Sequence, residues 1–250
     1  MGAQVVPDHR IQLLAAQESE MIEWTAKRAG IYGVFAHGAF SVMDSMVTDL
    51  PKSHMLFAGA WATVRSFAGQ ALLSAMRQHR IQMNLCIRQV LEGTTLAAYL
   101  LAHPQPDHRT EDDQGNMVEP KLLMTKLVYP WFKTTFPDEN AKIKELKDQI
   151  NLLSGHANLI ATSAVFDYGQ KAGMQITADF FDQPIDQMVW ANFYEVGEAI
   201  TLAIEVILHA NITATAFRLR RTIVEEYAAL DDLHRRATIQ FNTDYDAAQV

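Results

Sequence analysis

Apolar residues recur at helical spacing along most of the chain, whereas the alternation typical of strands is nearly absent. Prolines and glycines divide this pattern into segments, because both residue types favour helix ends and turns. We therefore predict an all-α, multi-helix bundle of about seven helices. The predicted helices cover roughly residues 8–30, 34–47, 53–77, 80–102, 121–132, 138–153, 184–211 and 215–239. The third and fourth are either nearly continuous or joined by a tight turn around Gln78 and His79.

The segments between the predicted helices are short, so we expect a single helical domain over residues 1–250. Residues 103–120 are rich in proline and acidic residues and lack periodicity, which predicts a loop. The tail at 242–250 is expected to fray. Only residues 174–179 alternate between apolar and polar, so we expect at most one short strand or hairpin, near 173–181.

Two of the predicted helices carry a narrow line of polar residues among apolar neighbours. Because these residues recur every three or four positions, each line follows one side of its helix. Each line could be a solvated face, a set of inward-facing structural ion pairs, or the wall of a functional pocket. The lines are Asn84, Arg88, Glu92, Thr95 and Tyr99 in the first helix, and Tyr194, Glu198, Thr201, Glu205, His209 and Thr213 in the second.

The pocket interpretation gives a specific chemistry. Arg88 would pair with Glu92, and also with Glu198 or Glu205 if the two lines faced each other. Arginine would then hold a small anionic ligand, and a carboxylate or histidine would act as a base. This is the pattern of a hydrolase or a nucleotide-handling enzyme. The candidate catalytic residues are Arg88, Glu92, His156, Glu198, Glu205 and His209.

No metal or cofactor is expected at these positions. A di-iron bundle needs glutamate and histidine three residues apart, whereas Glu205 and His209 are four apart. Arg88 would also repel a cation. The sequence contains no phosphate-binding glycine loop and no zinc-type cysteine pairs.

Composition narrows the range of partners. Of the 250 residues, 49% are hydrophobic, and the net charge is -8. An acidic chain repels phosphate backbones, so nucleic acid is not expected as a partner. The basic clusters at 218–221 and 234–236 lie among acidic residues, which favours a solvated helix face. Every long apolar run is interrupted by charged residues, so no membrane segment is expected.

The single cysteine, Cys86, lies in an apolar helix and is expected to be an inert core residue. A chain with one cysteine forms no internal disulfide, which fits a reducing compartment. The N-terminus has neither a basic start nor an apolar signal core. These observations predict a cytoplasmic protein.

Small residues gather on the third and fourth predicted helices. They allow close helix approach, either inside the protein or across a homodimer. Our first functional hypothesis is therefore a non-catalytic binding or regulatory protein that self-associates. The small residues are Ala58, Gly59, Ala62, Gly69, Ala71 and Ala75 in the third helix, and Gly93 and Ala97 in the fourth.

Three sequence features resemble a family of all-helical bacterial proteins similar to HEPN domains. They are the Arg-x-x-x-Glu helix with Arg88 and Glu92, then Tyr129, and then the segment from Leu153 to His156. The resemblance covers residues 50–165. It implies a helical bundle, functional roles for Arg88, Glu92 and His156, and a place in toxin or antiphage systems. No arginine precedes a histidine at the spacing of ribonuclease HEPN domains, so RNA cleavage is not implied.

Overall fold

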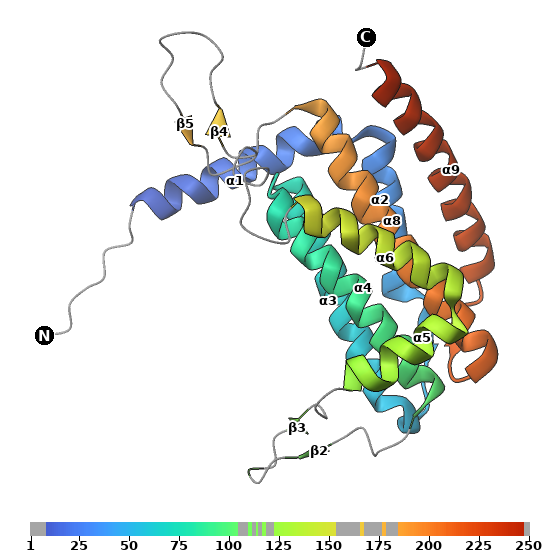
Figure 1. Cartoon of the computed structure of the whole chain (residues 1–250). Coiled ribbons are helices and arrows are strands. Elements are labelled where there is room, and N and C mark those ends of the chain that lie inside the picture. Colours follow the sequence, from blue (N-terminus) through green and yellow to red (C-terminus); the bar gives the residue numbers. More distant parts are fainter. Residues whose placement is uncertain are drawn as a thin grey trace, which may run out of the picture.

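The computed structural model describes residues 9–104, 110–111, 114, 117–118, 123–153, 166–167, 177–178 and 185–247. These residues form an all-α bundle, as the apolar periodicity predicts (Figure 1). Its α-helices are α1 (His9–Arg28), α2 (Gly30–Ser45), α3 (Met55–Met76), α4 (Arg80–Ala102), α5 (Tyr129–Thr135), α6 (Pro137–Leu153), α8 (Asp186–Ala214) and α9 (Ile223–Ala247). A short 3-10 turn, η1 (Lys52–His54), precedes α3, and a π-helix, η3 (Met124–Val128), leads into α5.

The central helix of the bundle is α8, which contacts α2, α3 and α4 on its apolar sides. By length and composition α8 could also cross a membrane, but 67% of its most apolar stretch is buried inside the protein. Such burial is expected of a core helix. Helix α1 extends from one side of the bundle, and α9 covers the opposite side (Figure 1).

Helices α3 and α4 form a hairpin joined by a tight turn, one of the two predicted arrangements. Gln78 in this turn has a φ of 53°, and its side-chain amide donates to the carbonyl of Ala75 at 2.8 Å. The helices approach closely at Gly93, where a Cβ would lie 2.8 Å from Val64 Cγ2. Glycine at this position therefore allows the two backbones to pack together.

The predicted break after the first helix is correct, but the second helix begins earlier than expected. Ala29 alone separates α1 from α2, and the positive φ of 52° at Gly30 turns the chain there. Gly33 lies inside α2 rather than in the break. A Cβ at Gly33 would lie 2.6 Å from the Cβ of Ala29, so its role is to allow the sharp turn.

The last helix is shifted toward the C-terminus relative to its predicted range. Strand β6 (Arg218–Leu219) pairs antiparallel with β1 (Val47–Asp49), and this pairing delays the start of α9 to Ile223. Helix α9 then continues to Ala247, into the range where we expected a frayed tail. The hydroxyl of Tyr32 donates to Asp244 at 2.6 Å and fixes this last part of α9 against α2.

Two further pairs of short strands lie in the connections. β2 (Thr110–Glu111) pairs antiparallel with β3 (Met117–Val118) within the predicted loop at 103–120. β4 (Phe166–Asp167) pairs antiparallel with β5 (Thr177–Ala178), which falls in the predicted strand region at 173–181. The predicted first start, near Pro7 and Asp8, lies outside the described residues.

Candidate functional site

The central residues of both polar lines are turned inward rather than toward solvent. Asn84 and Thr95 on α4 and Thr201 on α8 are at most 5% exposed. The charged members of the lines, such as Glu92 and Glu205, are half-buried. Only the C-terminal end of the α8 line, at His209, is exposed. A purely solvated face is therefore the wrong interpretation for most of each line.

The α4 line faces helix α6. Arg88 Nε lies 3.2 Å from Glu92 Oε1, as the spacing of four predicted. Two residues of α6 complete the cluster. Lys147 Nζ lies 2.8 Å from the same carboxylate oxygen, and Arg88 Nη1 donates to Asn151 Oδ1 at 2.8 Å.

The α8 line contacts both α6 and α9. Lys142 on α6 lies 3.6 Å from Glu205, and the hydroxyl of Tyr227 on α9 donates to the other carboxylate oxygen of Glu205 at 3.1 Å. Glu198 forms an ion pair with His234 of α9. The α8 line is therefore held between two flanking helices.

Among the described residues the two polar lines face different pockets, and neither of these pockets brings Arg88 together with Glu198 or Glu205. Glu198 and Glu205 line a pocket that includes neither Arg88 nor Glu92, whereas Glu92 lines a different one. Helix α6 explains the separation, because it packs against both α4 and α8 and supplies residues to each pocket. His209 lines neither of these pockets and instead lies 2.8 Å from Glu139 of α6. The remaining candidate, His156, lies outside the described residues.

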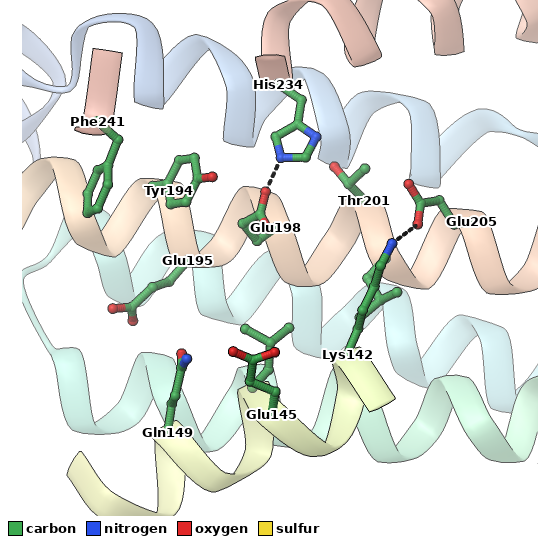
Figure 2. Close-up of a pocket in the computed structure, with 12 residues that line it drawn as sticks. Lys142, Glu145, Gln149, Tyr194, Glu195, Glu198, Thr201, Glu205, His234 and Phe241 are labelled. Carbon is green, nitrogen blue, oxygen red and sulfur yellow. Dashed lines mark ion pairs between the residues drawn. The ribbon is translucent and has the colours of Figure 1, made fainter. Parts of the chain in front are cut away.

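The pocket between α6, α8 and α9 has a volume of about 520 Å³ and combines acidic and aromatic walls (Figure 2). Volumes of this size suit small ligands. Four glutamates line it, against one lysine and one histidine, and the rings of Tyr194 and Phe241 stack at one end with 4.8 Å between centroids. The charged lining residues are Lys142, Glu145, Glu195, Glu198, Glu205 and His234.

Thr201, in the wall of this pocket, has an unsatisfied polar atom. Its residue is 5% exposed, and its buried Oγ1 has no hydrogen-bond partner among the described residues. An orphaned buried hydroxyl costs about 1–3 kcal/mol. Thr94 and Thr95 avoid this cost because they donate to carbonyls of their own helix, whereas the buried hydroxyl of Thr25 on α1 also lacks a partner among the described residues. Thr201 instead lies in the pocket wall between Glu198 and Glu205 (Figure 2).

Two groups of the pocket have shifted pKa values. Its hydrogen bond to Glu198 raises the pKa of His234, against an opposing effect of burial, and the charges of Glu198, Glu205 and Asp231 raise it further. Burial raises the pKa of Glu195, although Arg80 opposes this by pairing with its carboxylate. The raised pKa of His234 means that its imidazole stays charged to a higher pH than an isolated histidine does.

The described residues contain no group of three or more histidine, cysteine or acidic side chains arranged to hold a metal ion. The thiol of Cys86 is buried, and burial raises its pKa, as expected for an inert core residue. A small polar or charged organic molecule is the kind of ligand that the pocket chemistry suits.

Sequence reasoning missed the residues that complete the site from α6 and α9. Lys142 and Lys147 were expected on the solvated side of their helix; Lys142 is exposed, but Lys147 is half-buried. His234 was grouped with a solvated basic cluster. The neighbours Arg235 and Arg236 do pair with Asp232 at the surface, as expected. No feature of the sequence separates His234 from its solvated neighbours; only the structure shows that it lies one helical turn before Thr238, which forms a hydrogen bond with Tyr194.

The small residues of the α3–α4 pair act partly inside the protein. Gly93 and the buried Ala97 allow α3 and α4 to pack closely, so they need no second copy of the chain. Gly59 and Ala62 on α3 are exposed instead. Self-association of the protein stays a prediction.

No protein-family model matches the chain, and neither the curated proteins nor the solved structures contain a match. The resemblance to HEPN domains therefore stays a prediction as well, and function is argued from the geometry of the site alone.

Proposed function

We propose that this protein is a non-catalytic binding protein for a small organic cation, held in the pocket between α6, α8 and α9. The observation that carries the proposal is the acid-rich lining of this pocket, in which four glutamates stand against one lysine and one histidine.

The charges of the pocket favour a cation. Glu205, Glu198 and Glu195 each have a cationic partner, but Glu145 has no ion pair among the described residues. Its carboxylate points into the space between α6 and α8 (Figure 2). An ammonium group there would donate a charge-assisted hydrogen bond to Glu145.

The aromatic end of the pocket supports the same ligand class. The rings of Tyr194 and Phe241 provide an apolar wall that a ligand's alkyl chain can cover, and aromatic faces also attract cations. A short alkyl chain carrying an ammonium at one end and a second polar group at the other matches these walls.

A hydrolase is less well supported by this geometry. A general base must be unprotonated at the working pH, and Glu198 raises the pKa of His234 instead. Arg88 and Glu92, which the enzyme hypothesis required beside Glu198, line no wall of this pocket. A cytoplasmic location and a role in bacterial defence stay predictions.

Isothermal titration calorimetry with 1,4-diaminobutane tests the proposal, with butane-1,4-diol as the uncharged ligand of the same length. We expect saturable binding of the diamine alone. Glu145→Gln is expected to weaken that binding about tenfold, because one charge-assisted hydrogen bond contributes roughly 1.5 kcal/mol. Glu20→Gln on α1 removes the same charge away from the pocket and is expected to leave the affinity unchanged.

Thr201→Val separates ligand binding from folding. The valine keeps the shape of the side chain and removes the orphaned hydroxyl, so this variant is expected to be at least as stable as the wild type. Its affinity for the diamine is expected to be unchanged, because the hydroxyl is buried away from the pocket space. Equal binding of diamine and diol, or unchanged affinity in Glu145→Gln, would contradict the proposal.

A further inference from the structure

A second pocket lies on the other face of α6, between α4, α5 and η3, and its lining is rich in lysine. Its volume is about 590 Å³. Lys133 of α5 and Lys144 and Lys147 of α6 line it, against the two acidic residues Glu92 and Asp148. An excess of positive charge in a concave site is unexpected in a chain with a net charge of -8. Such a site attracts anions.

The α4 wall of this pocket carries one carboxylate beside two cations, of which Lys147 also lines the pocket. Glu92 is shared by Arg88 at 3.2 Å and Lys147 at 2.8 Å. Burial would raise the pKa of Glu92, but the hydrogen bonds and charges of Lys147 and Arg88 outweigh it and lower the pKa. The carboxylate is therefore ionised at neutral pH, and the cluster keeps one net positive charge.

The positive charges of the other two lysines of the pocket are not offset by a paired carboxylate. Lys133 and Lys144 form no ion pair or hydrogen bond with any other residue that the structure describes. Their ammonium groups come from different helices and line the same pocket, so one anion could accept hydrogen bonds from both. Two amide side chains, Asn140 and Asn151, supply further polar groups to the lining.

The backbone beside the pocket departs from regular α-helix, and two more residues of the pocket lining lie in or next to this irregular segment. The π-helix η3 carries Thr125, and Tyr129 follows at the start of α5. Single π-helical turns are rare and occur frequently at functional sites. Lys147 Nζ lies 5.5 Å from the centre of the Tyr129 ring, which holds this ammonium group at the pocket wall.

We propose that the pocket between α4, α5 and α6 binds a phosphate group, either free or carried by a small molecule. Lysine ammonium groups bind phosphate as point charges, and hydroxyl and amide donors complete its coordination. The proposal is independent of the cation pocket, because it rests on a different set of residues apart from their common helix α6.

The experiment is calorimetric titration of the full chain with inorganic pyrophosphate at constant ionic strength. We expect saturable binding that falls at least tenfold in the double variant Lys133→Gln/Lys144→Gln. The matched control is Lys27→Gln/Lys52→Gln, which removes the same charge from α1 and η1 and is expected to bind like the wild type. Circular dichroism melting checks that both variants are folded.

A parallel titration with ribose 5-phosphate and inorganic phosphate distinguishes the two sources of the group. Tighter binding of the sugar phosphate supports a phosphorylated small molecule, and equal binding supports the free anion. The proposal is overturned if pyrophosphate does not bind saturably, if chloride replaces it equally well, or if both double variants lose the same affinity. The diamine titration is separate, so the two proposals can fail independently.

Discussion

At the scale of single residues, neighbouring charged side chains of α6 face different pockets. Lys144 and Lys147 of α6 point to one pocket and Glu145 to the other. Residues 144, 145 and 147 are close in sequence but project from different sides of α6. The side chains that enter each pocket determine which ligand charge that pocket favours. The chemistry of both sites therefore depends on the register of this one helix.

The ion pair between Glu198 and His234 predicts a pH-dependent stability. Since the pKa of His234 is raised in the folded state, the pair contributes fully below the ordinary histidine pKa of about 6.5, and its contribution is lost as pH rises through the folded-state pKa. Glu198→Gln should therefore lower the free energy of unfolding by up to ~1 kcal/mol near pH 6 and by less at higher pH.

Urea unfolding of the wild type and Glu198→Gln across this pH range measures the effect, and NMR titration of the His234 imidazole measures its pKa directly. We expect the pKa of His234 to fall in the variant. An unchanged His234 pKa would show that Glu198 is not its main partner in solution.

The polar residues of α4 and α8 could be found from the sequence, but their partners could not. Arg88 and Glu92 are four residues apart in one helix, so periodicity alone predicts that they pair. Lys147 and His234 lie far away in the sequence, and each has the spacing of an ordinary surface residue on its own helix. Only the packing of α6 and α9 on the bundle turns them inward.

At the scale of elements, glycines decide how closely the helices approach. Gly197 of α8 faces the ring of Phe35 on α2, where a Cβ would lie 2.4 Å from a ring carbon. Gly59 of α3 is also helical, yet an added Cβ there would meet no atom within 4 Å. The same substitution therefore has opposite expected effects at the two positions.

Gly59→Ala should stabilise the protein by about 0.5–1 kcal/mol, because alanine is the better helix former. Gly197→Ala should destabilise it by about 1–3 kcal/mol, because the extra methyl group overpacks the core. Thermal unfolding followed by circular dichroism measures both. A stabilised Gly197→Ala variant would mean that α2 and α8 are not packed as closely as described.

The helix pattern was predictable to within about a turn for most elements, and the exceptions have local causes. The start of α9 moved because β6 pairs with β1, a contact between residues 47–49 and 218–219 that periodicity does not encode. The start of α2 moved because Gly33 serves a close approach to Ala29 instead of a break. Both errors arise where tertiary contacts override local propensity.

At the scale of the whole molecule, one continuous apolar core joins residues from α2 through α9. A single core predicts cooperative unfolding. Heating should give one transition with the same midpoint by far-ultraviolet circular dichroism and by tryptophan fluorescence. The fluorescence reports on both ends of the bundle, since Trp131 contacts Tyr99 near the C-terminal end of α4, whereas Trp190 near the start of α8 donates to the carbonyl of Arg28. Two separate midpoints would contradict a single helical domain.

Because α6 forms one wall of each pocket, the two sites share a boundary. A shift of α6 that narrows one pocket changes the width of the other, so a ligand that draws the helix toward itself alters the free energy of binding at the far side. Thermodynamic linkage requires this effect to be reciprocal. The architecture thus provides a route by which the concentration of one small molecule could control the occupancy of a second.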